Sequence, residues 1–177
     1  MNLPNKLTIA RMIAVPFFIA AYMLQLYPAA LVIFVAASVT DFFDGKIARE
    51  RGLVTNFGKI MDPLADKILV YSALCLFIES EIITAWMMII ILAREFIVAG
   101  MRTVAASEGT VLAAGMSGKI KTVLQMVAVI VLLFSLCLGS EMLIVMPVGK
   151  YIFYASLVMT VYSGAEYVLK NRSVFRQ

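Results

Sequence analysis

Six long apolar segments constrain this sequence more than any other feature. A helix that crosses the hydrocarbon core of a bilayer needs about 20 mainly apolar residues. Segments of that kind lie at residues 7–26, 29–49, 59–79, 82–105, 118–139 and 147–169. Apolar residues make up 63% of the chain, whereas soluble globular domains are about 45–50% apolar. The sequence therefore predicts an all-α, polytopic membrane protein with six transmembrane helices, forming a single domain over residues 1–177.

The basic residues are distributed unevenly between the two sides of these spans. Six spans place both termini on one side, together with the connections near 50–58 and 106–117. All of the 15 lysines and arginines except Lys150 fall at or near that side, or in the half-spans leading to it. Because cytoplasmic loops carry an excess of Lys and Arg, we expect an N-in, C-in protein of the cytoplasmic membrane. The same asymmetry accounts for the net charge of +4, so no nucleic-acid partner is expected.

Four aspartates, the only ones in the chain, lie close together in the sequence. Asp41 and Asp44 are spaced i, i+3, and Asp62 and Asp66 are spaced i, i+4. Each pair therefore lies on one helix face. A short connection makes the two helices antiparallel neighbours, so the pairs can converge at one depth near the cytoplasmic side.

Clustered carboxylates repel one another strongly where the dielectric constant is low, so cations must offset them. Lys46, Arg49, Lys59 and Lys67 could fold back over them as a buried salt-bridge network. Divalent metal ions such as magnesium, which prefer oxygen ligands, are the other possibility. A proton or cation pathway is a third, because ionisable groups inside membranes are usually functional. The chain has no histidine and two isolated cysteines, which excludes histidine ligands, histidine-based triads and Cys-x-x-Cys sites.

The spacing of the aspartates narrows these alternatives. Residues 41–66 fit the pattern D-x2-D-G-x2-A-R-x8-G-x3-D-x3-D at every fixed position. This pattern resembles the signature of the CDP-alcohol phosphotransferase family, whose members also have six helices. The resemblance implies two divalent metal ions (Mg²⁺ or Mn²⁺) held by Asp41, Asp44, Asp62 and Asp66. It also implies that Asp66 is the general base of a phosphatidyl transfer from a CDP-linked lipid, and that the protein is a homodimer.

The remaining motif residues suit a nucleotide-lipid site. Gly45 and Gly58 remove side chains where a backbone or a nucleotide approaches closely, although close helix packing also uses glycine. Ala48 widens the face of Gly45, and Arg49 could hold a phosphate through two hydrogen bonds.

Three polar residues outside the aspartate helices are assigned by resemblance. Asn5 and Thr8 match residues that help to hold the CDP-lipid head group in the branch of the family that forms phosphatidylglycerophosphate. An N-terminal cap with an interfacial anchor is the alternative for this segment. Thr55 matches a small hydroxyl position of the family's nucleotide site.

Two further clusters predict a phosphorylated acceptor. Arg94 lies in mid-span, and Arg102 is on the same face eight residues on. Glu95 is adjacent to Arg94, so we expect the two side chains not to face each other. Lys119 and Thr122 share a face of the next span and complete a predicted acceptor-phosphate site.

Lys121, between the two, is expected to point elsewhere as a positive-inside anchor. The segments around Arg94 and Lys119 also resemble the same branch of the family. The predicted substrates are therefore CDP-diacylglycerol and sn-glycerol 3-phosphate, which would give phosphatidylglycerophosphate and CMP. The same chemistry with an inositol phosphate or phosphatidylglycerol as acceptor is the alternative, and an ion-coupled transporter is the alternative from another class.

Overall fold

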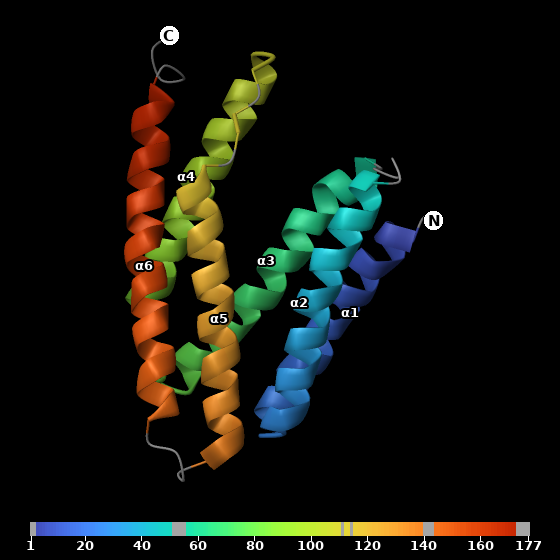
Figure 1. Ribbon diagram of the computed structural model, residues 1–177, viewed down its shortest axis with the longest axis vertical. Helices are drawn as coiled ribbons and strands as arrows, with labels where there is room; N and C mark the ends of the chain where they lie inside the picture. The colour runs from blue at the N-terminus through green and yellow to red at the C-terminus, as the bar shows by residue number, and fades with distance from the viewer. Residues whose placement is uncertain (1–2, 51–55, 111, 114, 140–143, 173–177) are drawn as a thin grey trace.

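The computed structural model consists of helices joined by short connections (Figure 1). It describes residues 3–50, 56–110, 112–113, 115–139 and 144–172, and their side chains except those of 3–4, 41–50, 56–57, 59–60, 63 and 66. The helices are α1 (Leu3–Met23), α2 (Tyr27–Glu50), α3 (Asn56–Glu79), α4 (Ala85–Ser107), α5 (Met116–Leu138) and α6 (Val145–Lys170). The described residues contain no strand, so the prediction of an all-α fold is confirmed.

Each predicted apolar segment forms one helix, with ends shifted by a few residues. The segment predicted at 29–49, for example, is helical from Tyr27 to Glu50. Among the described residues, three helical stretches are long and apolar enough to cross a membrane: Asn5–Met23, Met116–Leu138 and Val145–Lys170. A membrane protein is consistent with these helices, and a crossing by all six stays a prediction.

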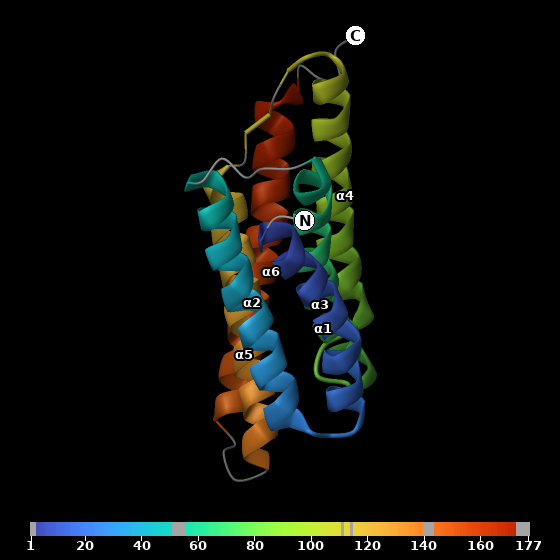
Figure 2. The same ribbon diagram turned by 90° about the vertical axis from the view of Figure 1, so that its right-hand side faces the viewer.

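The helices run alternately up and down, so their ends gather at two ends of the molecule (Figures 1 and 2). One end holds the starts of α1, α3 and α5 and the ends of α2, α4 and α6, and we call it the polar end. The opposite end of the molecule is called the apolar end. Helix α1 packs against α2 and α3, while α6 packs extensively against α5 and also against α4. Helix α3 meets α4 and α5 only sparsely.

Aromatic side chains fill the core towards the apolar end. The rings of Phe18 and Phe34 have centroids 5.7 Å apart, and those of Tyr22 and Phe77 are 6.0 Å apart. The hydroxyl of Tyr22 shares a 2.8 Å hydrogen bond with that of Ser80, which satisfies the polar end of the ring. Helices α5 and α6 come close at Gly149, where an added Cβ would lie 2.7 Å from Leu132. Close packing of side chains therefore defines this end.

Large apolar side chains also cover the outside of the bundle. Phe17, Phe96 and Val158 are 63%, 71% and 69% exposed, and they belong to three different helices. Water would be a poor solvent for such a surface, because large exposed apolar side chains promote association. Lipid would be a good one, which agrees with the apolar composition.

Candidate functional site

A cavity of about 1050 Å³ opens at the polar end between α3, α4, α5 and α6. Its described lining contains five cationic side chains and two carboxylates: Lys67, Arg94, Arg102, Lys119, Lys170, Glu95 and Glu166. Hydroxyl-bearing residues add hydrogen-bonding groups, namely Thr103, Ser117, Thr122, Ser163 and Tyr167. The excess of positive charge makes the cavity suited to an anionic ligand.

The four residues predicted to bind the acceptor phosphate all line this cavity. Arg94 and Arg102 come from α4, and Lys119 and Thr122 come from the first turns of α5. The Thr122 hydroxyl donates to the carbonyl of Gly118 at 3.1 Å, so its oxygen remains available as an acceptor. The structure brings these residues together, and their role in binding stays a prediction.

Arg94 lies in a slot between α5 and α6 that two glycines leave open. An added Cβ would lie 3.0 Å from Nη2 of Arg94 at Gly118 and 3.0 Å from its Cγ at Gly164. Nη1 of Arg94 donates to Glu95 Oε1 at 3.0 Å. Its Nε is buried and has no hydrogen-bond partner among the described residues. A buried donor of this kind is costly unless a ligand or water satisfies it.

The expectation that Arg94 and Glu95 do not face each other is therefore wrong. Neighbouring Cβ atoms on a helix do point in different directions. The arginine side chain is long enough to bend around the helix, so its guanidinium reaches the neighbouring carboxylate.

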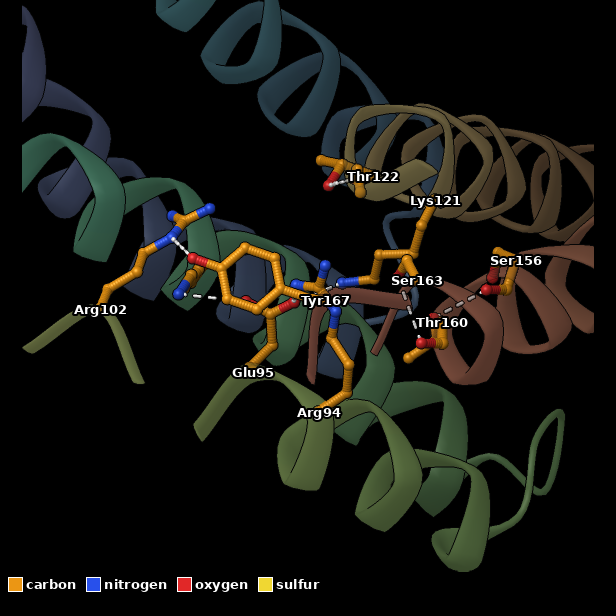
Figure 3. Close-up of polar contacts among 11 residues, drawn as sticks. Arg94, Glu95, Arg102, Lys121, Thr122, Ser156, Thr160, Ser163 and Tyr167 are labelled. Carbon is orange, nitrogen blue, oxygen red and sulfur yellow. Dashed lines mark hydrogen bonds and ion pairs between the residues drawn. The ribbon is translucent and has the colours of Figure 1, made fainter. Parts of the chain in front are cut away.

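Glu95 is the centre of a cluster of cations from three helices (Figure 3). Its carboxylate is 3.1 Å from Nζ of Lys67 on α3, 3.0 Å from Arg94 on α4 and 2.7 Å from Nζ of Lys121 on α5. The Glu95 side chain is 13% exposed. A carboxylate this buried requires cationic partners.

The prediction for Lys121 is also wrong. Lys121 is 4% exposed and points inward to Glu95, rather than outward as an anchor. Sequence reasoning placed it on another face from Lys119, which is correct for the helix. It could not tell which of the two faces is turned to the protein interior.

Helix α6 contributes residues that sequence reasoning missed. Tyr167 accepts a 3.1 Å hydrogen bond from Nε of Arg102, and the guanidinium carbon lies 5.5 Å from the centroid of its ring. Glu166 accepts hydrogen bonds at 2.5 Å from both Ser117 and Lys170, which joins α5 to α6 at the cavity. The polar residues of an otherwise apolar final helix were the available signal.

The aspartate motif lies on α2 and α3 at the same end of the molecule. Asp41 and Asp44 lie within α2, and Asp62 and Asp66 lie within α3, so each aspartate pair keeps its predicted helical spacing. Asp62 Oδ1 accepts a 2.5 Å hydrogen bond from the hydroxyl of Thr8 on α1, and Thr8 is fully buried. Asn5 and Gly58 are also buried.

Several predicted site residues lie outside the description of side chains or of the chain, namely Asp41, Asp44, Gly45, Ala48, Arg49, Thr55 and Asp66. Among the described side chains, no group of three potential metal ligands occurs. Since three of the four aspartates are not among them, the metal site stays a prediction. The donor set itself is suitable, because carboxylate oxygens are the ligands that Mg²⁺ prefers.

Comparison with known proteins agrees with the family that the aspartate motif resembles. Residues 1–162 match the CDP-alcohol phosphatidyltransferase family, and the chain belongs to this family. Its curated relatives include proteins named CDP-diacylglycerol–glycerol-3-phosphate 3-phosphatidyltransferase. The relative from Bacillus subtilis is 42% identical over 96% of this chain and 95% of its own length. The corresponding protein of Rickettsia felis is 38% identical over 98% and 97% of the two chains. That of Shigella flexneri is 35% identical over 97% and 96%.

Proposed function

We propose that this protein transfers the phosphatidyl group of CDP-diacylglycerol to sn-glycerol 3-phosphate, giving phosphatidylglycerophosphate and CMP. The family membership and the names of the relatives support the reaction. The cationic cavity is the observation that supports a phosphorylated acceptor. A phosphate dianion would offset its excess positive charge and could accept a hydrogen bond from the buried Nε of Arg94. A neutral acceptor such as free inositol or serine would do neither.

Each predicted acceptor residue has a distinct role in this proposal. Arg94, fixed by its glycine slot, and Lys119, at the start of α5, bind the phosphate. Nε of Arg102 donates its hydrogen bond to Tyr167. The two remaining guanidinium nitrogens are thereby oriented to donate to a second phosphate oxygen. The Thr122 oxygen accepts a hydrogen bond from the acceptor.

The proposed CDP-lipid site lies at the polar end, beside the aspartates of α2 and α3. We propose that Asp41, Asp44, Asp62 and Asp66 hold two divalent ions, Mg²⁺ or Mn²⁺. Ions bound in this way stabilise charge on the attacking and leaving oxygens of a phosphoryl group. Thr8 fixes the orientation of Asp62 through its hydrogen bond, as neighbours of metal ligands commonly do. The proposed contacts to the CDP-lipid are Asn5, Thr8, Gly45, Ala48, Arg49, Thr55 and Gly58.

The reaction needs one proton transfer and one displacement at phosphorus. Asp66 takes the proton from the acceptor hydroxyl, whose oxygen forms a bond to the phosphorus that bears the lipid. The bond from that phosphorus to the CMP oxygen breaks, and CMP leaves with the electron pair. The acceptor residues keep the hydroxyl in place, and such positioning can supply a large part of the rate enhancement.

The polar end is proposed to face the cytoplasm, with all six helices crossing the cytoplasmic membrane and residues 1–177 forming one domain. The basic residues of the polar end support this orientation. Cysteines introduced at positions 2 and 175 should resist labelling from outside the cell, whereas one at position 141 should react. We also propose a homodimer, which chemical cross-linking in membranes would test.

A purified-enzyme assay with a panel of acceptors tests the reaction. CMP release is measured with CDP-diacylglycerol and, in turn, glycerol 3-phosphate, inositol 1-phosphate, phosphatidylglycerol, inositol and serine. Glycerol 3-phosphate should give the highest kcat/KM. A better rate with inositol or serine would overturn the acceptor assignment and leave the family assignment intact. Failure to release CMP with every acceptor would overturn the enzyme proposal and favour a transporter.

A further inference from the structure

We propose that Lys67 and Glu95 are positioning residues, whose ion pair holds the aspartate helix α3 in register with the acceptor cavity on α4 and α5. The proposal rests on the proposed function, and it assigns to these two residues a role that is separate from substrate binding. The reaction joins two substrates whose sites lie on different helices, so something must fix the distance between the sites.

The packing of α3 gives this ion pair its importance. Along its length α3 packs against α1, but it meets α4 and α5 only sparsely. Figure 1 shows α3 crossing the bundle obliquely, so that α3 and α4 diverge towards the polar end. Direct packing of α3 against the cavity walls is therefore slight, and its other link to them runs through α1 and α2, of which α2 packs against α5.

The Glu95 carboxylate connects α3 to the helices of the cavity wall. One oxygen, Oε2, pairs with Lys67 of α3 at 3.1 Å. The other, Oε1, pairs with Lys121 of α5 at 2.7 Å and with Arg94 at 3.0 Å. A single carboxylate thus connects α3 to α5 from its place on α4, and the two oxygens are divided between the two sides.

Lys67 lies beside the aspartates that are proposed to act in the reaction. It directly follows Asp66, the proposed base, and lies five residues after Asp62. A shift of α3 at Lys67 would therefore move both aspartates relative to an acceptor held by Arg94 and Lys119. Misplacement of reacting groups by about 1 Å can lower a rate by about 100-fold.

Lys67→Met is the informative substitution, because it breaks the bridge without leaving a buried charge unpaired. The Lys67 side chain is 40% exposed, and Glu95 would keep Arg94 and Lys121 as partners. We expect kcat at saturating concentrations of both substrates to fall at least about tenfold. The KM for either substrate should change less than about threefold, since the binding groups of each half remain in place. Lys67→Arg preserves the pair and should restore most of kcat.

Glu95→Gln tests whether Lys67 acts through Glu95. In the Glu95→Gln background, the further change Lys67→Met should have almost no additional effect on kcat, because coupled residues are non-additive. Lys150→Met, on α6 towards the apolar end, is the matched control and should leave kcat unchanged. Thermal unfolding in detergent identifies any variant that loses activity only because it fails to fold.

Three results would overturn the proposal. A tenfold rise in the KM for glycerol 3-phosphate with unchanged kcat would make Lys67 a direct acceptor ligand. Additive effects of Lys67→Met and Glu95→Gln on kcat would show that the two residues act independently. Wild-type kinetics in Lys67→Met would show that the ion pair does not position α3. If the acceptor panel identifies another acceptor, the same variants are assayed with it, and the same loss of kcat is expected. The acceptor assignment and the positioning role of Lys67 and Glu95 can therefore fail independently of each other.

Discussion

The two ends of this bundle use glycine for opposite purposes. At the apolar end, Gly149 lets α6 approach α5 so closely that an added Cβ would lie 2.7 Å from Leu132. At the polar end, Gly118 and Gly164 of the same two helices leave a slot for the Arg94 side chain. One helix pair is thus closed by packing at one end and opened for a charged side chain at the other.

This difference indicates that stability and specificity reside in different parts of the molecule. Aromatic side chains and small residues pack against one another at the apolar end. Substitutions there should therefore change the free energy of unfolding. The polar end is hollow and held by ion pairs around Glu95 and Glu166. Its substitutions should change kinetic constants more than stability. Four predictions test this separation, in order of decreasing effect.

Removal of the metal ions should have the largest effect. Excess EDTA should abolish nearly all CMP release, and Mg²⁺ or Mn²⁺ should restore it, because the aspartates are proposed to act through bound metal. Asp41→Asn, Asp44→Asn and Asp62→Asn should each lose nearly all activity while thermal unfolding stays close to that of the wild type. Asp66→Asn should keep CDP-lipid binding better than it keeps turnover. Full turnover in EDTA would show that the reaction does not need divalent metal ions.

Phe77→Ala should have the largest effect on stability. Phe77 is fully buried against Tyr22. Its loss leaves a cavity and should destabilise the folded state by about 3 kcal/mol. Phe96→Ala is the matched control, because Phe96 is 71% exposed. The measurement is unfolding in detergent, together with the KM for both substrates. A changed KM in the folded Phe77→Ala variant would contradict the separation of the two ends.

Arg94→Ala should raise the KM for glycerol 3-phosphate by about 10- to 100-fold, the loss of about 1.5–3 kcal/mol for a charge-assisted hydrogen bond. Lys119→Ala should act in the same direction. The KM for CDP-diacylglycerol should change little in either variant. Steady-state kinetics with each substrate varied in turn provide the measurement. Equal increases in both KM values would mean that the cavity does not distinguish the acceptor from the lipid donor.

Gly118→Ala should have the smallest effect, a rise of a few-fold in the KM for the acceptor. The added methyl would lie 3.0 Å from Nη2 of Arg94, which can shift by a few tenths of an ångström at a modest cost. Gly100→Ala on α4 is the matched control, since an added Cβ there meets nothing within 4 Å. Similar kinetics in the two variants would show that the slot does not position Arg94.

The sequence by itself determined the helices, the aspartate frame and the family. Each is a local property of the chain. Apolar segments of about 20 residues predict helices because length and hydropathy act within one segment. The spacing of Asp62 and Asp66 places them on one face of any helix that contains them. Arg94, Arg102 and Lys119 were found as candidates because cations within apolar segments are rare.

Only the tertiary structure decided which of these faces meet. The pairs Lys121–Glu95, Arg102–Tyr167 and Ser117–Glu166 join residues that are 26, 65 and 49 positions apart. Such contacts depend on how each helix is rotated about its axis, and a helix rich in apolar residues on all sides carries little sign of that rotation. The inward direction of Lys121 and the bridge from Lys67 to Glu95 are therefore products of packing between α3, α4 and α5, which no single segment encodes.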